Sequence, residues 1–228
     1  YSITTEGEPM AQFYGWKSLG ILEDQEAVEN NAVVPGQLPG TPHWYDKNDD
    51  GIIDEQDRMI IGNPHPDFRG GINNRITYKN WDFNVSMSYA HNFDVYASLE
   101  ASSLNLDGVF NVLKEAKHRW KSPEEPGNGR IAASFHQTYL DRDGNSDFVY
   151  EDISFLKIQN VSIGYTFDFD FMKQMRVSCT IQNPYIFTGY RYGNPDVNVY
   201  GNNSLAQGVD RFYYPLTQTV MFGINLTL

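Results

Sequence analysis

The stretch TQTVMFGINLTL, residues 217–228, decides the fold of this chain. Its large apolar residues recur at every second position: Val220, Phe222, Ile224, Leu226 and Leu228. Most of the positions between them hold polar or small residues. A period of two predicts a β-strand with one apolar and one polar face. Such a strand fits either a sandwich packed on a core or the wall of a membrane barrel, and one strand alone does not separate the two.

Other segments repeat this pattern and predict an all-β chain. We expect strands near residues 9–18, 70–78, 81–93, 155–168, 175–187 and 217–228. The segment 81–93 alternates most strictly, with Trp81 at one end of its apolar row and Tyr89 at the other. Aromatic residues at both ends of an apolar row are typical of a lipid-facing strand.

The lengths of the connections favour a barrel over a sandwich. Long connections, expected as outside loops at 19–67, 94–150 and 189–214, alternate with short ones at 79–80 and about 169–174. Outer-membrane barrels have short periplasmic turns and longer extracellular loops, whereas sandwiches follow no such rule. About eight strands are needed to close a barrel. We therefore expect about six antiparallel strands that form the C-terminal portion of a larger transmembrane barrel.

Composition excludes several classes of protein. The formal net charge of -12 argues against a nucleic-acid partner, because basic patches supply most of the affinity for phosphates. The single cysteine, Cys179, excludes an internal disulfide framework and a cysteine-based zinc site, and it is interpreted as a small apolar filler. No apolar run is long enough for a transmembrane helix. We find no catalytic motif and predict that the chain is not an enzyme.

The motif DKNDDGIIDEQD at residues 46–57 has the spacing of a calcium-binding EF-hand loop. The predicted ligands are Asp46, Asn48, Asp50, the backbone carbonyl of Ile52, Asp54 and Asp57. Gly51 stands where such a loop turns sharply, and Ile53 is the expected inward anchor. We predict a structural Ca²⁺ site, with Mg²⁺ as the alternative ion. The competing interpretation is an acidic solvated turn without a metal.

A ligand surface is indicated only weakly. Tyr190, Tyr192 and Tyr200 fall in the third long connection, and aromatic faces suit sugar rings or peptide side chains. The alternative for all three is packing within the loop or membership of an aromatic girdle.

Several blocks of the sequence, in order, resemble one family. They are EGEPMAQFYGWKSLGIL at 6–22, YDKNDDGIIDEQDRMIIGNPHPDFRGGI at 45–72, YKNWDF at 78–83, HRW at 118–120, EDISFLKIQNVSIGYTF at 151–167, QNPYIFTGYRYGNPDV at 182–197 and YPLTQTVMFGINLTL at 214–228. Together they are similar to the C-terminal part of SusC/RagA-family TonB-linked outer-membrane proteins.

This resemblance implies a barrel of about 22 strands, filled by an N-terminal plug that is absent from this chain. It implies import of an oligosaccharide or a peptide across the bacterial outer membrane, with a SusD-like surface lipoprotein as partner. TonB-ExbB-ExbD would supply the energy through the plug. The alternative to a transporter is a calcium-stabilised surface or secreted β-module that binds glycans.

Overall fold

A computed structural model describes most of the chain. The described residues are 2–104, 111–134, 150–170, 173–197, 201, 203, 205–211 and 214–227. The chain divides into two compact units, which we describe separately. Unit 1 comprises Tyr1–His65, Asp94–Asp152 and Val197–Phe212, and unit 2 comprises Pro66–Phe93, Ile153–Asp196 and Tyr213–Leu228.

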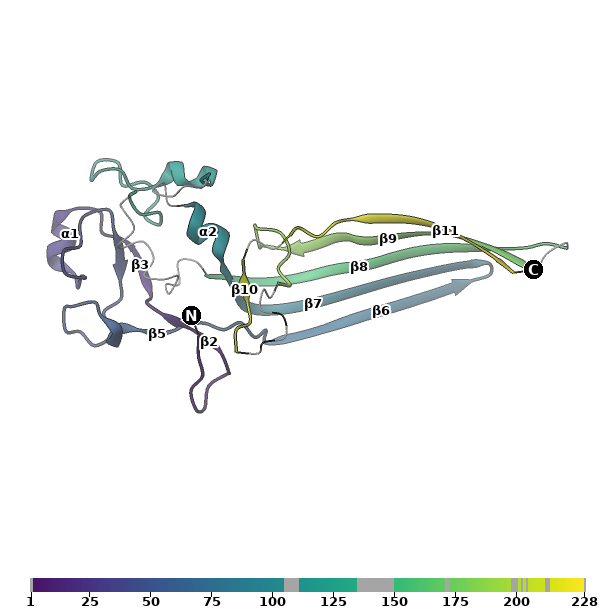
Figure 1. Ribbon diagram of the computed structural model, residues 1–228, viewed down its shortest axis with the longest axis horizontal. Helices are drawn as coiled ribbons and strands as arrows, with labels where there is room; N and C mark the ends of the chain where they lie inside the picture. Colours follow the sequence, from purple (N-terminus) through teal and green to yellow (C-terminus); the bar gives the residue numbers. More distant parts are fainter. Residues whose placement is uncertain are drawn as a thin grey trace. The chain divides into compact units, whose positions relative to one another are not determined.

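Unit 2 is built on one antiparallel sheet of long strands (Figure 1). The strands are β6 (Phe68–Tyr78), β7 (Trp81–Ala97), β8 (Tyr150–Asp168), β9 (Gln174–Thr188) and β11 (Thr219–Thr227). They lie side by side in the order β6-β7-β8-β9-β11. Neighbours in the sheet are therefore also neighbours in the chain, as in an up-and-down barrel wall.

The hairpin of β6 and β7 begins at the predicted two-residue turn. Tyr78 pairs with Trp81, and Lys79 adopts a positive φ of 54° between them. The next residue, Asn80, donates a hydrogen bond from its side chain to the backbone carbonyl of Thr166 at 2.7 Å. A positive φ is what a tight hairpin turn needs, and the asparagine then attaches this turn to the next hairpin.

The pairing of β8 with β9 contains one irregularity. The apolar positions of β8 change from even numbers, with Leu156 and Ile158, to odd numbers, with Val161 and Ile163. A register shift lies between Ile158 and Asn160, where this change occurs. All four apolar residues are therefore paired with apolar or small residues of β9, namely Phe187, Tyr185, Ile181 and Cys179. The shift keeps apolar residues beside one another along the full length of both strands.

Unit 1 contains short elements. They are β1 (Ser2–Ile3), β2 (Gln12–Gly15), β3 (Ser18–Ile21), α1 (Gln25–Asn30), β4 (Pro42–Trp44), η1 (Glu55–Asp57), β5 (Met59–Gly62), α2 (Ser98–Ser103), η2 (Lys114–His118) and β10 (Val209–Asp210). One small sheet has the order β1-β2-β5, and β3 pairs with β4 in another. β10 runs parallel to the end of β7, where Val209 pairs with Tyr96.

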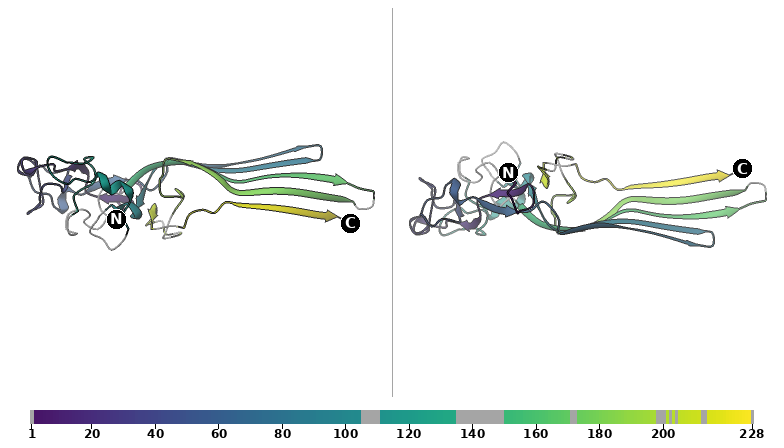
Figure 2. Two further views of the ribbon diagram at one scale, coloured as in Figure 1. Left: turned by 90° about the horizontal axis from the view of Figure 1, so that it is seen from above. Right: turned by 90° about the horizontal axis from the view of Figure 1, so that it is seen from below.

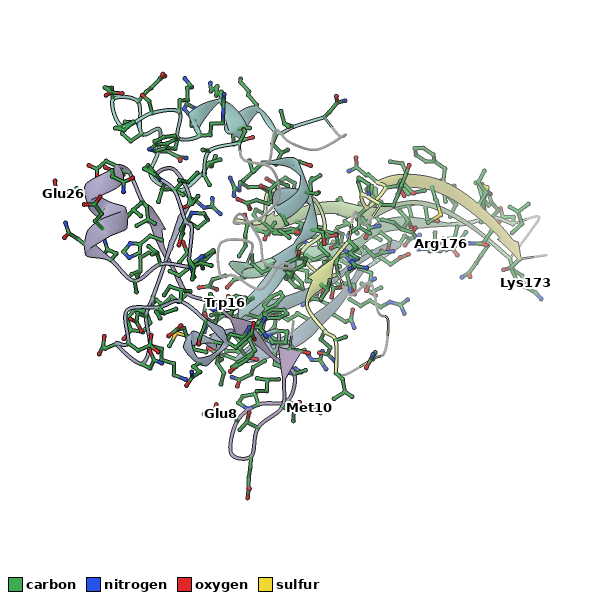
Figure 3. All side chains as sticks on the ribbon, turned by 60° about the vertical axis from the view of Figure 1, so that its left-hand side comes forward. Glu8, Met10, Trp16, Glu26, Lys173 and Arg176 are labelled. Atoms are coloured by element: carbon green, nitrogen blue, oxygen red, sulfur yellow. The ribbon has the colours of Figure 1, made fainter. Side chains whose placement is uncertain are left out.

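Three hydrophobic clusters stabilise unit 1. The first joins Phe13, Tyr96 and Val209, the second Trp16, Trp44 and Ile53, and the third Leu104, Ala116 and Ile131. Each cluster brings together residues from segments distant in sequence, and Figure 3 labels Trp16 of the second. The long connections of unit 1 are therefore packed structures with small cores of their own.

The prediction of a barrel strand at residues 9–18 is wrong. Only Gln12–Gly15 form a strand there, and this strand, β2, pairs with β1 and β5 outside the large sheet. The positive φ of 59° at Ala11 bounds it on one side. Successive residues Gln12 and Phe13 are both buried, so the segment has no exposed face. The apparent alternation of Gln12, Tyr14 and Trp16 was too short to distinguish a lipid-facing strand from a strand buried on both sides.

The remaining strand bounds differ from the predictions mainly in length. β7 extends to Ala97 instead of ending at 93, and β8 begins at Tyr150 instead of 155. The segments expected as the loops 19–67, 94–150 and 189–214 contain the short elements of unit 1 apart from β1, β2 and the first residue of β3. No helix among the described residues is long and apolar enough to cross a membrane.

Candidate membrane-facing surface and loop sites

One side of the unit 2 sheet is a continuous apolar surface, which we call the apolar face. The register aligns its members across three strands: Val161, Ile163 and Tyr165 of β8, Ile181, Cys179 and Val177 of β9, and Val220, Phe222 and Ile224 of β11. On the first hairpin it continues with Ile72 and Ile76 of β6, paired with Met87 and Phe83 of β7. Many of these side chains are exposed, and Phe222 retains 81% of its accessible surface.

Aromatic residues gather at both ends of the apolar face. At the end with the short connections, the ring of Trp81 meets the ring of Tyr165 edge-on, with 4.8 Å between centroids. At the opposite end, Tyr185 and Phe187 make a similar contact at 4.7 Å. Aliphatic residues occupy the strands between these groups. Two aromatic belts around an aliphatic band are typical of membrane-spanning barrels, because amphipathic rings favour the two interfaces of a bilayer.

A glycine shapes one of these belts. Gly70 of β6 pairs with Tyr89 of β7. A Cβ atom at Gly70 would lie 2.7 Å from the hydroxyl oxygen of Tyr89, so any larger residue would displace the ring. Phe68 then contacts Tyr89 edge-on, with 6.1 Å between ring centroids. The glycine therefore allows an aromatic side chain to lie across the neighbouring strand.

The opposite side of the sheet is polar and internally bonded. Arg176 of β9 donates two hydrogen bonds to the carboxylate of Asp82 on β7, at 2.8 and 2.6 Å. The two strands are not adjacent, and the ion pair crosses over Gly164 of β8. A Cβ at Gly164 would lie 2.5 Å from Nη2 of Arg176 and 2.6 Å from Oδ1 of Asp82. The missing side chain thus creates the space for this bidentate pair.

Amide and hydroxyl groups extend this polar network along the sheet. The side-chain amide of Gln159 donates to the hydroxyl of Ser88 at 3.1 Å, and its oxygen accepts from Ser86 at 3.3 Å. Figure 3 shows Arg176 near Lys173, toward the end of the sheet where the short connections lie. A hydrogen-bonded polar side opposite an apolar side matches the lumen and lipid surfaces of a barrel wall.

The sheet is a single layer. Figure 2 shows its strands seen from two opposite sides, and the described residues of unit 2 form no second sheet or helix. An exposed row that includes Ile163, Val220, Phe222 and Ile224 is unfavourable in water, since apolar surface is driven away from the aqueous phase. The sandwich interpretation requires these residues to be buried against a second sheet, and they are not.

The first half of the acidic loop adopts the predicted tight turn. The carboxylate of Asp46 accepts hydrogen bonds from the backbone N–H groups of Asp49 and Gly51, both at 2.8 Å. Asp49 and Gly51 have positive φ values of 58° and 81°. Asn48 and Asp50 lie on the same turn, joined by a side-chain hydrogen bond of 2.9 Å. The residues at the first, third and fifth loop positions are thus close together and exposed or half-exposed.

The second half of the loop is arranged differently from an EF-hand. Asp54 caps the short helix η1, and its carboxylate accepts from the backbone N–H of Gln56 at 2.7 Å. Asp57 is fully buried, and it accepts from the backbone N–H groups of Asp54 at 2.7 Å and Lys47 at 3.0 Å. In the described part of the chain, no three His, Cys, Asp or Glu side chains form a group that could hold a metal ion. The predicted ligands at positions nine and twelve therefore close the loop through the backbone in this structure.

Ile53 takes the inward position that the motif predicts for it. Ile53 is 3% exposed and packs in the cluster with Trp16 and Trp44, whereas its neighbour Ile52 is 51% exposed. The backbone N–H of Ile53 donates to the carbonyl of Val33 at 3.2 Å. The indole N–H of Trp16 also donates to the carbonyl of Asp54 at 2.8 Å, so the loop is anchored by hydrogen bonds as well as by the buried side chain of Ile53.

The structure describes two of the three tyrosines proposed as ligand contacts. Tyr190 is only 5% exposed, and its ring contacts the ring of Tyr192 edge-on with 5.7 Å between centroids. Tyr192 is half-buried, and Tyr200 lies outside the described residues. The buried position of Tyr190 favours packing within the connection over an open stacking face.

One histidine in unit 1 has a shifted acidity. His43 of β4 is half-buried, and this burial lowers the pKa of its imidazole because the charged form loses hydration. It lies opposite Gly20 in the β3–β4 pair. The neutral form is therefore favoured in the folded loop.

Sequence reasoning missed the Asp82–Gly164–Arg176 arrangement. Each residue falls at a polar-side position of its own strand, and that was visible in the alternation. Their convergence depends on the register of three strands, which the hydrophobic pattern does not specify to the residue. A glycine at a polar-side position of a strand was the one available signal.

Curated relatives show which proteins this chain resembles in sequence. TonB-dependent receptor P26 of Formosa agariphila is 29% identical over 229 residues, which cover 97% of this chain. TonB-dependent receptor SusC of Bacteroides thetaiotaomicron is 28% identical over 189 residues, which cover 80% of it. This chain is therefore similar in sequence to SusC-type TonB-dependent receptors. The resemblance drawn from the sequence blocks is thereby confirmed, although no protein-family model matches the chain.

The fold of the chain is similar to that of a solved structure. The structure of the RagAB peptide importer in its open-open state matches 100% of the chain with a TM-score of 0.70 and 16% sequence identity. The expected fold, a section of a large β-barrel, is confirmed. The chain spans 23% of the receptor P26, 17% of SusC and 24% of the matched RagAB chain, so it corresponds to about a quarter or less of their length.

Proposed function

We propose that this chain forms part of the barrel wall of an outer-membrane nutrient importer. The observation that carries the proposal is the apolar face, bounded by aromatic belts and backed by a hydrogen-bonded polar side. Such a sheet is stable when lipid covers one side and a polar interior covers the other. The homology to TonB-dependent receptors supports transport as the activity, and it supports the bacterial outer membrane as the location.

The competing function is a calcium-stabilised β-module on the cell surface or in the medium that binds glycans. Such a module would fold alone in water and would expose Val220, Phe222 and Ile224 to it. Exposed apolar surface on this scale marks a contact surface or causes aggregation. The structure therefore favours the importer over the module.

The substrate and partners follow from the same proposal. We propose a peptide or an oligosaccharide as cargo, a SusD-like surface lipoprotein as partner, and TonB-ExbB-ExbD as the energy source acting through a plug elsewhere in the full-length protein. Support comes from the relative named SusC and from the likeness to the RagAB peptide importer. No nucleic-acid partner is proposed, because the chain is acidic.

An uptake assay tests the importer. The full-length protein that contains this chain is expressed in a host with a complementary TonB system, and its location is checked by membrane fractionation. Uptake of labelled peptides and oligosaccharides is then measured with and without a functional TonB. The proposal predicts outer-membrane protein and TonB-dependent uptake of one of the two classes. Recovery of the protein in the soluble fraction contradicts the importer proposal. Uptake that is equal with and without a functional TonB contradicts it as well.

We also propose that the loop at residues 46–57 binds Ca²⁺, or Mg²⁺, as a structural ion. Side-chain oxygens of Asp46, Asn48 and Asp50 stand on one tight turn beside the backbone of Ile52, which fits the first half of an oxygen ligand set. Asp54 and Asp57 fit less well, because the two carboxylates form the capping box of η1 and Asp57 is fully buried. Binding through all six predicted ligands would require these two side chains to reorient.

Limited proteolysis of the full-length protein tests the ion. Ca²⁺ is expected to slow cleavage between residues 46 and 57, and Asp50→Ala is expected to remove this protection. Asp24→Ala serves as the control, since Asp24 caps helix α1 outside the motif. Equal cleavage with Ca²⁺ and with a chelator contradicts the ion site and leaves the importer proposal intact.

A further inference from the structure

Unit 1 contains a small pocket outside the acidic loop. Its volume is about 180 Å³. It is lined by Ser2 and Phe13, by Tyr96 near the end of β7, and by residues between 206 and 211, all of which belong to unit 1. Three residues of the first hydrophobic cluster, Phe13, Tyr96 and Val209, form the buried part of its lining. The volume is below the range of about 300–1,000 Å³ for sites that enclose a drug-sized ligand. The pocket therefore suits one side chain of a larger ligand.

The walls of this pocket are fixed by backbone pairing. Val209 pairs with Tyr96 across β10 and β7, and the backbone N–H of Tyr96 donates to the carbonyl of Gly208 at 2.8 Å. Gly208 has a positive φ of 72°, and a Cβ there would lie 2.7 Å from the Cβ of Pro64 and 3.0 Å from the ring of Phe13. On the other side, Ser2 pairs with Phe13. The pocket is thus formed before any ligand arrives, which limits the entropy lost on binding.

The lining of the pocket contains one charged side chain, and its charge is positive. Arg211 is exposed and is the charged residue of the lining, and Gln207 adds a half-buried amide. The surrounding acidic residues do not favour an anion, so Arg211 is the local group that can attract one. A guanidinium beside an apolar cavity suits a carboxylate placed next to an apolar group, because arginine binds carboxylates through two parallel hydrogen bonds.

We propose that this pocket binds the C-terminal residue of a peptide, with the apolar side chain inside and the terminal carboxylate on Arg211. A C-terminal residue carries its carboxylate and its side chain on the same carbon, so a pocket for one side chain satisfies both groups. A sugar ring presents hydroxyl groups around its whole rim, and those that face the apolar part of the lining, formed by Phe13, Val209 and Ala206, would lack partners there. The inference rests on the proposed importer and narrows its cargo to peptides.

Binding to the full-length protein in detergent tests this inference. The probes are a tetrapeptide ending in leucine, its C-terminal amide, and the same peptide ending in glycine. The free acid is expected to bind about tenfold more tightly than the amide, since a hydrogen bond to a charged group is worth roughly that ratio. Arg211→Gln is expected to abolish the difference between acid and amide. Arg69→Gln, at an exposed arginine of β6, is the matched control and is expected to keep it.

A second variant addresses the apolar part of the site. Ala206→Leu fills the pocket from its wall, and it is expected to weaken the peptide ending in leucine more than the one ending in glycine. Correct folding of each variant is checked by its recovery in the outer membrane. Equal binding of acid and amide overturns the inference, as does an Arg211-dependent preference for an acidic oligosaccharide over the peptides. TonB-dependent uptake would persist in either case, whereas failure of the importer itself would remove uptake.

Discussion

The two units of this chain differ in whether their large apolar side chains are buried. Unit 1 buries residues such as Phe13, Trp16 and Ile53 in small clusters of its own, although it contains only short strands and helices. Unit 2 has the longest strands of the chain and leaves a row that includes Phe222 and Ile224 exposed. In this chain, long regular strands therefore do not imply a buried hydrophobic core. Unit 1, whose sequence alternates less regularly than that of unit 2, is the unit that buries apolar side chains in clusters as a globular domain does.

Charge follows the same division. Unit 1 contains 24 Asp and Glu residues against 10 Lys and Arg residues, whereas unit 2 contains 5 against 7. Carboxylates are well hydrated in an aqueous loop region and costly near lipid. The acidic balance of the whole chain is thus a property of its loops, and the low charge of the sheet agrees with contact to a bilayer.

The largest expected effect comes from a charge on the apolar face. Ile163→Lys introduces an ammonium among Val161, Cys179 and Tyr165, and a lysine at the middle of a bilayer costs about 2–4 kcal/mol. Assembly of the full-length protein in the outer membrane is expected to fall severely. Ser162→Lys, one position away on the polar side, is the matched control and is expected to assemble. The measurement is the amount of folded protein in purified outer membranes, and equal loss in both variants would remove the distinction between the two faces.

A pair of adjacent isoleucines tests the core of unit 1. Ile53→Ala removes a buried side chain that packs with Trp16 and Trp44, and it is expected to destabilise this region by about 2–4 kcal/mol. Ile52→Ala changes an exposed residue and is expected to cost less than about 0.5 kcal/mol. Hydrogen exchange of the segments around Trp16 and Trp44 measures the difference. Similar exchange in both variants would show that the cluster does not hold the loop.

Two glycines of unit 2 provide the next comparison. Gly164→Ala places a Cβ against both Arg176 and Asp82, and is expected to separate the ion pair at a cost of about 1–3 kcal/mol. At Gly189 no atom lies within 4 Å of an added Cβ, so Gly189→Ala is the control and is expected to be nearly neutral. Thermal unfolding of the full-length protein in detergent reports the effect. An unchanged midpoint in the first variant would mean that the pair does not bind the three strands together.

The smallest expected effect is a pH dependence in the β3–β4 pair. Burial lowers the pKa of His43 in the folded state, so the unfolded segment takes up a proton first as the pH falls. Stability that is present above the ordinary histidine pKa of about 6.5 is lost as the pH falls through the lowered folded value. Protection of the Ser18–Ile21 amides from hydrogen exchange, corrected for the intrinsic pH dependence of exchange, is expected to fall at low pH, and His43→Gln is expected to remove this fall. A dependence that persists in the variant would assign it to another group.

The same contrast explains what could be predicted from the sequence. In the strands of unit 2, apolar and polar residues alternate over long runs such as Trp81 to Tyr89. A run of this length predicts both that the segment is a β-strand and which of its side chains lie on the apolar face. The segment at 9–18 could not be predicted in this way, since β2 is four residues long and its partners are distant in sequence. The acidic motif predicted the buried anchor Ile53, but the capping role of Asp54 and Asp57 depends on a short helix that the spacing does not specify. The pocket at Val209 depends on a parallel pair of two residues, which leaves no periodic signal.

The claim that one face of the unit 2 sheet contacts lipid can be measured at the single cysteine of the chain. Cys179 lies on this face between Ile163 and Phe222, and Ser178 is its neighbour on the polar side. Spin labels are attached to Cys179, or to Ser178→Cys in a variant with Cys179→Ala, in full-length protein whose other cysteines are replaced. In bilayers, the label at 179 is expected to be more accessible to oxygen than to a water-soluble nickel complex, and the label at 178 is expected to lack this preference. A label at 179 that neither reagent reaches, or that the nickel complex reaches more readily, would contradict the account.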